Sequence, residues 1–372
     1  MIRSWPLYAK LAMLMVLLFL LFYTIYLGEQ ILVPLGFSFL FAVLLRPLEA
    51  AILRLHIPRV IAILLVILIA LLVVAGIIVF ISSQIASLMS DIPQVKKNLE
   101  DLYRQSQIWI GHTFHLTATQ QDNLFEKAKT ETVNNLGAVG TFNVITTSVA
   151  TITLIPVYVF LFMYYRTLLL RFVIQIFAEE HGPKVEEIIR EIRYVVQHYI
   201  TGLLTETTIV AILNTLGLFL IGAPYAVLLG LVGAILNLIP YIGGLLAIIL
   251  TALLTFTNTG SVEVMTWSII VYLGVQFIDN NFLVPYIIGS RVKLNALISI
   301  IGVLLGGALC GIGGMFLSIP IIAICKVIFD RIDELKPYGA LLGDDVPAWN
   351  PLSGKNFRRR KKIPAEKSTL SK

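Results

Sequence analysis

Charged residues are scarce in this chain of 372 residues. Asp, Glu, Lys and Arg together make up 13% of the sequence, against about 25% in typical globular proteins. Hydrophobic residues make up 58%, and the mean hydropathy is +0.88. Such a chain has too few polar residues to cover the surface of a soluble fold. The composition excludes disordered chains, secreted disulfide scaffolds and ordinary cytosolic enzymes, and it indicates a polytopic membrane protein.

Residues that carry enzyme chemistry are also sparse. The sequence has no Gly-x-x-x-x-Gly-Lys-Ser/Thr loop, no His-Glu-x-x-His motif and no Cys/His cluster with metal-site spacing. The two cysteines, Cys310 and Cys325, would lie about 22 Å apart on one helix, which is too far for a disulfide. His112 and His115 lack a third metal ligand nearby. We therefore expect no enzymatic activity, no cofactor and no bound metal.

The positive net charge of +6 belongs to the C-terminal tail. Residues 355–372 hold eight Lys/Arg and one Glu, a net charge of +7, so the rest of the chain carries 6 − 7 = −1. This distribution does not indicate a nucleic-acid-binding surface. Polybasic tails either adhere to anionic lipid or act only as an orientation signal, and both readings apply to 355–372.

Runs without charged residues locate the membrane spans, because a helix needs about 20 apolar residues to cross ~30 Å of hydrocarbon. Such runs occur at 11–28, 30–45, 60–90, 132–165, 207–262, 264–278 and 294–325. Only 30–45, which Pro34 interrupts, and 264–278 are clearly short. The first run lacks a small-x-small cleavage site, so we interpret it as a retained span and not as a signal peptide.

Basic residues set the expected orientation. Lys and Arg follow the second and fourth runs and fill the tail, which places these segments and both termini in the cytoplasm. The segment 91–131, with five Lys/Arg and six Asp/Glu, then lies outside. We expect an inner-membrane, multi-pass protein.

Helix breakers interrupt the two long C-terminal runs. Residues 237–244 read Asn-Leu-Ile-Pro-Tyr-Ile-Gly-Gly in the middle of 207–262, and 294–325 is rich in glycine. Irregular backbone at membrane depth is tolerated only inside protein or along a wet cavity. Two re-entrant hairpins, over 225–257 and 294–328, fit this pattern, and so do two broken helices. The positive-inside rule, applied to the basic residues between the two segments, favours the hairpins.

Polar groups at membrane depth are the candidate transport site. A carboxylate in the centre of a span costs about 3 kcal/mol, and Glu206 and Asp279 both have apolar sequence beside them. Each is either a proton or cation site or an interfacial residue that caps a helix. Free backbone groups and small residues at the two breaks can approach a ligand closely. The remaining candidates are Asn237, Pro240, Tyr241, Gly243 and Gly244 at the first break, Asn280, Asn281 and Pro285 after Asp279, and Gly311, Gly313 and Gly314 at the second break.

Two stretches have the pattern of amphipathic helices outside the bilayer. Residues 81–102 carry apolar residues at alternating spacings of four and three, which indicates either an oligomer contact or a helix packed on its own chain. Residues 183–200 combine an apolar face with a charged face, as an interfacial helix does.

The C-terminal half resembles the autoinducer-2 exporter-like family, also known as PerM-like permeases. The matching motifs are Tyr199-Ile-x-Gly202, Gly222-x-Pro224-Tyr225-Ala226, Asn237-Leu-Ile-Pro240-Tyr241-Ile242-Gly243, Asp279-Asn280-Asn281-x-x-x-Pro285-x-x-x-Gly289, Gly306-Gly307-x-x-x-Gly311-x-x-Gly314-Met315 and Ile319-Pro320. The layout of 1–198 is similar as well. Leu203, Gly244 and Asn295-Ala296 stand where similar proteins often have Gln, Pro and His-Pro, so these departures bear on the substrate.

The resemblance implies a passive or ion-coupled transporter that assembles as a homo-oligomer, such as a pentamer. Some similar proteins are linked to export of the quorum-sensing signal autoinducer-2, and others look like sodium or lithium/proton antiporters. We therefore carry three hypotheses: export of a small polar solute, cation/proton exchange at Asp279 with Glu206 assisting, and a membrane scaffold that transports nothing.

The predicted fold is an all-α membrane protein with about eight transmembrane segments, two of them hairpins. Its expected parts are N-terminal transmembrane helices at 1–81, an extracytoplasmic helical insertion at 82–141, a transmembrane helix at 142–165, a cytoplasmic amphipathic helix at 166–199, a transport core at 200–330 and a cytoplasmic basic tail at 331–372. Its expected partners are the lipid bilayer, a small molecule or cation, and copies of the same chain.

Overall fold

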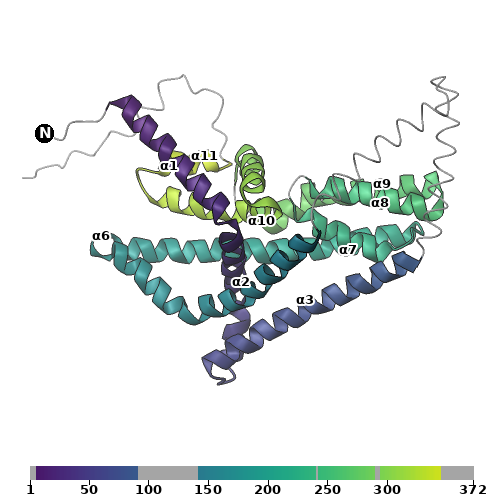
Figure 1. Ribbon diagram of the computed structural model, residues 1–372, viewed down its shortest axis with the longest axis horizontal. Helices are drawn as coiled ribbons and strands as arrows, with labels where there is room; N and C mark the ends of the chain where they lie inside the picture. Colours follow the sequence, from purple (N-terminus) through teal and green to yellow (C-terminus); the bar gives the residue numbers. More distant parts are fainter. Residues whose placement is uncertain (1–5, 91–140, 240–241, 290–293, 345–372) are drawn as a thin grey trace, which may run out of the picture.

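The computed structural model describes residues 6–90, 141–239, 242–289 and 294–344. These residues form helices joined by short turns (Figure 1), and no strand occurs among them. The helices are α1 (Leu7–Leu27), α2 (Glu29–Leu53), α3 (Arg59–Ser90), α6 (Thr141–Leu220), α7 (Ala226–Asn237), α8 (Gly243–Thr259), α9 (Val262–Ile278), the π-helix η1 (Asp279–Gly289), α10 (Ala296–Arg331) and α11 (Lys336–Leu342). Most of the heptad pattern in 81–102, together with Pro240, Tyr241 and the basic tail, lies outside the described residues.

Six helical segments in the described residues are long and apolar enough to cross a membrane. They are Glu29–Leu53, Arg59–Leu88, Thr153–Ile176, Gly182–Leu220, Val262–Ile287 and Ala296–Arg331, and three shorter apolar helices accompany them. Large apolar side chains of α1 and α3 remain exposed along most of their length. This combination confirms the predicted all-α membrane fold.

Two spans are longer than the charge-free runs predicted. The second run ended at Arg46, but α2 continues to Leu53 through Pro34 and Pro47. After Pro34, the Ser38 hydroxyl lies 2.6 Å from the Pro34 carbonyl oxygen and 3.1 Å from the Ile155 carbonyl oxygen of α6, so it can donate to either and links α2 to α6. The run 264–278 also extends further, because helical structure continues from α9 through η1. The charge-free criterion stopped at Arg46 and at Asp279, but helical structure continues through both residues, and Asp279 is buried.

Helix α6 folds back on itself between its two apolar stretches, so that its two arms form a V (Figure 1). The second arm, Gly182–Leu220, runs alongside α10 and leads to α7. Its residues Val196, Tyr199 and Leu203 share a buried apolar cluster with Leu40 of α2 and Leu317 of α10. The second arm of α6 is therefore the central element on which the C-terminal helices pack.

Two helical hairpins are present where they were predicted. Helices α7 and α8 pack against each other, and the start of α8 comes so close to the end of α7 that a side chain at Gly243 would overlap the Leu236 carbonyl oxygen. Helix α10 folds back at Gly311, which has φ +57° and ψ −148°. Its two halves are in close contact, since a side chain at Gly306 would overlap Gly314 and one at Gly307 would lie 2.5 Å from the Met315 methyl carbon. A single unbroken crossing by α10 is thus excluded.

The two hairpins open toward opposite ends of the second arm of α6. The open end of the α7–α8 hairpin lies beside the end of α3, where Tyr225 Oη is 3.5 Å from the Ser87 carbonyl oxygen. The open end of α10 is held at the start of the arm, where Arg331 pairs with Glu187 and Glu191. The turn of each hairpin therefore points back into the middle of the molecule.

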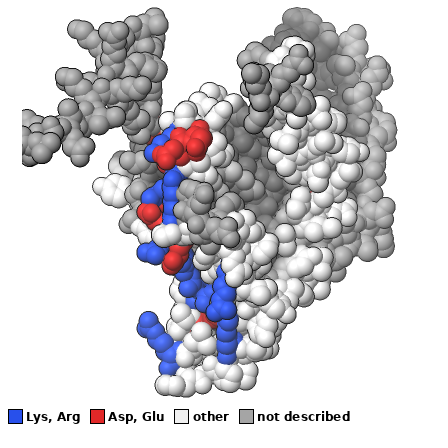
Figure 2. All heavy atoms as spheres, turned by 90° about the vertical axis from the view of Figure 1, so that its left-hand side faces the viewer, with Lys and Arg blue, Asp and Glu red and all other residues white. Residues whose placement is uncertain are grey.

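Many charged side chains gather on one side of the molecule. Figure 2 shows Lys, Arg, Asp and Glu in one band on this side, next to a wide surface without charges. Among the ion pairs of the described residues are Lys326 with Asp330 and Lys336 with Asp333, near the end of α10 and the start of α11. The separation matches a protein whose charged end meets water and whose other surface meets lipid.

Candidate functional site

A cavity of about 550 Å³ lies where the turn of the α7–α8 hairpin meets α6, α9 and η1. Its polar lining consists of Tyr199, Glu206, Asn237, Gln276, Asp279 and Asn280, and its other lining residues are Leu203, Leu238, Gly244, Leu245, Ile248 and Val284. Residues that are up to 85 positions apart in the sequence (284 − 199 = 85) therefore converge on one space. Polar groups gathered at one place inside an apolar bundle are typical of a ligand site.

Asn237 joins the two buried carboxylates. Its Nδ2 atom donates a hydrogen bond of 3.2 Å to Glu206 Oε1 and one of 3.0 Å to Asp279 Oδ2. Glu206 is 4% exposed and Asp279 is 2% exposed. One neutral amide thus bridges two acids that the surrounding helices keep away from bulk solvent.

The local structure explains why these three side chains meet. Asn237 is the last residue of α7, so the hairpin turn that follows it presents its amide at the end of the helix. Glu206 projects from the second arm of α6, on which α7 packs. Asp279 is the residue at which the α-helical geometry of α9 widens into the π-helix η1. Widened helical turns are frequent at functional sites, because they re-aim side chains.

The acid pair has no positively charged partner among the residues that the structure describes. No lysine or arginine is among the cavity-lining residues that the structure describes. The Oδ1 atom of Asp279 is buried and has no hydrogen-bond partner in the described part of the chain. An unpaired buried carboxylate oxygen is costly, so a proton or a cation bound here would stabilise the site.

Gln276 extends the polar network along α9. Its Nε2 atom lies 3.4 Å from Asp279 Oδ2 and 3.3 Å from Asn280 Oδ1. On the opposite wall, a methyl group at Gly244 would lie 2.5 Å from Gln276 Oε1 and 3.5 Å from Asn237 Oδ1. The small residue at 244 therefore keeps the wall open in front of the two amides.

The structure brings together only part of the predicted site. Glu206, Asn237, Gly244, Asp279 and Asn280 line the cavity. The others that the structure describes do not: Gly243 forms the hairpin turn, Asn281 donates to the Phe277 carbonyl oxygen, Pro285 is exposed in η1, and Gly311, Gly313 and Gly314 form the turn of α10. A side chain at Gly313 would lie 2.7 Å from Val33 Cγ1, so this second turn packs on α2 and not on the cavity.

Three further buried or cavity-lining polar residues were not among the predicted site residues. Gln276 and Tyr199 both line the cavity, and Gln276 was visible as a polar residue within an apolar run. Glu49 follows the end of the charge-free run 30–45 in the sequence, yet it is 2% exposed. Its carboxylate lies 3.7 Å from Arg59 Nε and 3.8 Å from an Arg166 amino nitrogen. The signal that could have revealed this buried site is an acid with arginines on both sides in the sequence.

Comparison with known proteins identifies the family. The model of the AI-2E family transporter matches residues 12–334. "Putative transport protein YueF" of Bacillus subtilis (strain 168) is 26% identical over 314 residues, which are 80% of this chain and 82% of that protein. "Putative transport protein YrrI" of the same organism is 32% identical over 130 residues, 35% of this chain and 36% of that protein. "Putative permease PerM" of Escherichia coli (strain K12) is 28% identical over 179 residues, 48% of this chain and 50% of that protein.

The family match covers every described helix from α2 to α10, including both hairpins and the cavity between α6, α7 and η1. It agrees with the resemblance seen in the sequence motifs and with the six described helical segments that are long and apolar enough to cross a membrane. The chain therefore belongs to the AI-2E transporter family and is a multi-pass membrane transporter.

Proposed function

We propose that the protein is a cation- or proton-coupled transporter of the inner membrane, and that Glu206, Asn237 and Asp279 form its coupling site. The observation that carries this proposal is the single Asn237 amide between two buried carboxylates. Two acids with no lysine or arginine on the described cavity wall leave the site short of positive charge. Carboxylate and amide oxygens are also the ligands that hard cations prefer.

Coupling requires that one site take up a proton and a cation in turn. With a proton on one carboxyl group, the pair can share a hydrogen bond and needs no metal ion. When the proton leaves, sodium or lithium can take its place between Glu206 and Asp279. The Asn237 amide, which now donates to both acids, would have to turn so that its Oδ1 atom faces the cation. Exchange of the two species at this point would drive one of them against its gradient.

A second candidate is export of a small polar solute, such as a quorum-sensing signal of the autoinducer-2 type. The size of the cavity favours this candidate, because about 550 Å³ is far more than one cation needs and falls within the range of small-molecule pockets. The amides of Asn237, Gln276 and Asn280 would bind hydroxyl groups of such a solute. The acid pair would then supply the coupling ion for export.

The hairpins are the moving parts in both candidates. They open toward opposite ends of α6, and the turn of the first carries Asn237 to the cavity. A displacement of this turn would break the Asn237 bridge and open the cavity to one side. We further propose that both termini are cytoplasmic, that both hairpins are re-entrant, that 200–330 forms the transport core, and that the protein works as a homo-oligomer.

The test uses purified full-length protein in liposomes that contain a pH-sensitive dye and carry an imposed pH gradient. Addition of sodium or lithium outside should collapse the gradient in wild-type liposomes but not in empty ones. Asp279→Asn should abolish the response, and Glu206→Gln should reduce it strongly. The matched control is Glu263→Gln, which removes an exposed carboxylate at the start of α9.

The outcomes separate the candidates. A cation-dependent collapse that requires Asp279 supports cation/proton exchange. No collapse in correctly inserted protein rejects exchange of these cations and leaves solute export, which is then measured as release of loaded polar solutes. Wild-type behaviour of Asp279→Asn in both assays would contradict the proposed site.

A further inference from the structure

A second cavity, of about 350 Å³, lies between α2 and the two arms of α6. Its walls are almost entirely apolar: Phe39, Ala42 and Val43 from α2, Phe162, Met163, Leu169, Leu170 and Val173 from the first arm, and Ile189 and Ile192 from the second. Leu169 and Val173 are 41% and 37% exposed, so the cavity is open at its side. It is distinct from the acid-pair cavity, with which it shares no lining residue.

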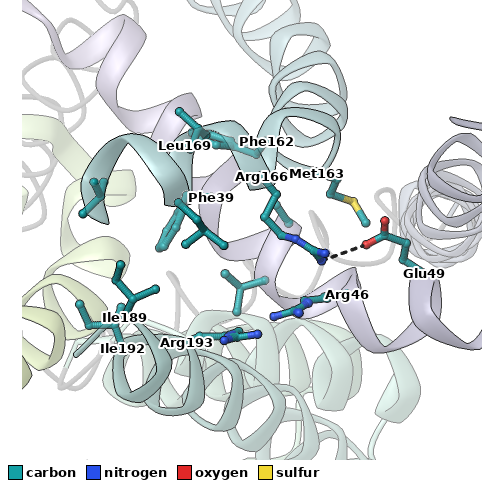
Figure 3. A pocket seen from close by; sticks show the side chains of 14 residues that line it. Phe39, Arg46, Glu49, Phe162, Met163, Arg166, Leu169, Ile189, Ile192 and Arg193 are labelled. Atoms are coloured by element: carbon teal, nitrogen blue, oxygen red, sulfur yellow. Dashed lines mark ion pairs between the residues drawn. The ribbon is translucent and has the colours of Figure 1, made fainter. Parts of the chain in front are cut away.

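Three arginines line one part of this apolar cavity. Arg46, Arg166 and Arg193 come from three different segments, and Figure 3 shows their guanidinium groups near one another, apart from Ile189, Ile192, Phe39 and Leu169. Glu49 is the single acidic residue of the lining, and it pairs with Arg166 and with Arg59. In the described part of the chain, Arg46 and Arg193 form no ion pair with a carboxylate. The lining therefore carries more positive charge than its one acid can neutralise.

A shallow, open hollow of about 330 Å³ adjoins this cavity and shares Arg46 and Arg193 with it. Its other lining residues are Pro47, Ala50, Arg190, Tyr194 and Gln197. The two arginines thus stand between the apolar cavity and an open hollow that holds a third arginine. Figure 2 shows that the positive charges gather on this side of the molecule, within the charged band.

We propose that this site binds an anionic phospholipid, with an acyl chain in the apolar cavity between α2 and α6 and the phosphate at Arg46 and Arg193. An apolar cavity with an open side fits an acyl chain, and guanidinium groups bind phosphate oxygens with paired hydrogen bonds. Basic pockets between membrane helices are known to hold anionic headgroups. Since the cavity is lined by both arms of α6, a bound lipid would brace the bend that positions the arm carrying Glu206.

The test measures lipid binding to the purified full-length protein in a neutral detergent. Dioleoyl phosphatidylglycerol is titrated and followed by native mass spectrometry, and dioleoyl phosphatidylcholine serves as the uncharged comparison. Wild-type protein should bind phosphatidylglycerol much more tightly than phosphatidylcholine. Arg46→Gln/Arg193→Gln should weaken phosphatidylglycerol binding about fivefold for each arginine, or roughly 25-fold in total.

The matched control is Arg54→Gln/Arg171→Gln. This variant removes the same charge from two exposed arginines, on α2 and on the first arm of α6, that line neither cavity. It should leave phosphatidylglycerol binding within about twofold of wild type, because charges outside the site contribute only weak, screened attraction. An equal loss in the control variant would overturn the proposal and reduce the effect to general attraction by a basic surface.

A second pair of variants tests the acyl chain. Val173→Trp fills the apolar cavity, whereas Ile176→Trp adds the same side chain one turn further along α6, outside the lining. Val173→Trp should weaken phosphatidylglycerol binding at least tenfold, and Ile176→Trp should not. Displacement of phosphatidylglycerol by millimolar inorganic phosphate, together with normal binding by Val173→Trp, would show a site for a small anion and would overturn the lipid assignment. The binding assay involves no transport, so its result is independent of the proposed coupling site.

Discussion

The molecule buries carboxylates in two regions, and the two regions differ in whether arginines compensate the negative charge. Glu49 is 2% exposed and has Arg59 and Arg166 within 4 Å. Asp279 is also 2% exposed, but in the described structure it shares a neutral amide with a second acid, Glu206. Burial is therefore equal in the two regions, and only the compensation of charge differs.

This difference separates a structural acid from a functional one. The fold itself supplies the positive charge that Glu49 needs, so this pair can hold α2, α3 and α6 together without any ligand. At Asp279 the described residues supply hydrogen bonds but no positive charge. A proton or cation that binds and leaves can therefore neutralise this carboxylate. Carboxylates without a fixed countercharge inside a membrane are accordingly the more informative marker of a transport site.

Replacement of Asp279 should have the largest effect on function. Asp279→Asn keeps the size of the side chain and leaves an amide oxygen that can still accept from Asn237, but it removes the charge that binds a proton or cation. Transport in liposomes should fall to the level of empty liposomes. The midpoint of thermal unfolding in detergent should stay the same or rise, since a buried charge without a countercharge has been removed.

Replacement of Glu49 should produce the opposite pair of results. Glu49→Gln removes the partner of two arginines and should lower stability by about 2 kcal/mol, less than for a fully hydrogen-bonded buried pair because both ion pairs are longer than 3.5 Å. Thermal unfolding checks this loss, and the transport rate per folded molecule should remain close to wild type. Loss of transport with unchanged stability in Glu49→Gln would contradict the assignment of Glu49 as a structural acid and Asp279 as a functional one.

A smaller effect is expected at the wall of the acid-pair cavity. Gly244→Ala places a methyl group 2.5 Å from Gln276 Oε1, and the flexible glutamine must move away from the network. Transport of a polar solute should fall severalfold, with little change in the amount of folded protein. Gly243→Ala is the contrasting variant, because its methyl group would meet the rigid Leu236 carbonyl oxygen and should prevent correct folding of the hairpin. Equal behaviour of the two variants would mean that the wall at Gly244 has no particular role.

Much of the fold follows from the sequence, because the bilayer imposes simple rules. Apolar run length predicted α1 and α3 closely, and the Gly and Pro breaks predicted both hairpins. The run 132–165 predicted the first arm of α6 only roughly, because the arm continues past Arg166 to Ile176. Glu206, Asn237 and Asp279 could be singled out one by one, since polar groups at membrane depth are costly. Their meeting around one amide could not, because it depends on how α7 packs against α6 and η1.

The failures of prediction have a common cause, which is tertiary packing. Gly311, Gly313 and Gly314 share the small-residue pattern of the first hairpin turn, but the direction in which α10 folds back places them against α2. Arg46 was interpreted as an orientation signal, and Arg193 as an orientation signal on the charged face of 183–200. Nothing in the sequence indicates that the V of α6 brings them to one cavity. Local pattern identified the residue types, and long-range contacts decided which of them share a site.

The smallest effect on stability is expected for the replacement of Asp333, a carboxylate that forms ion pairs but is exposed to solvent. The Asp333 side chain is 70% exposed and lies 3.7 Å from Lys184 Nζ and 2.5 Å from Lys336 Nζ. The hydrogen bond and the charge of Lys336, followed by the charge of Lys184, hold the pKa of Asp333 below its usual value. Because the pKa of Asp333 is lower in the folded protein than in the unfolded chain, its ion pairs stabilise the fold fully at pH values above the unfolded pKa, which is about 4. This stabilisation is lost only as the pH falls through the lower pKa of the folded protein.

Asp333→Asn should therefore leave thermal unfolding nearly unchanged between pH 5 and 8, because exposed ion pairs are screened by water and salt. Unfolding curves of wild type, Asp333→Asn and Asp344→Asn should superimpose across this range, with Asp344 as the exposed acid that serves as control. A destabilisation by Asp333→Asn as large as that by Glu49→Gln would show that burial does not determine how much an ion pair contributes to the stability of this protein. The three acids Asp279, Glu49 and Asp333 would then have to be ranked by their partners alone, and the inference that an unpaired buried carboxylate marks the transport site would lose its physical basis.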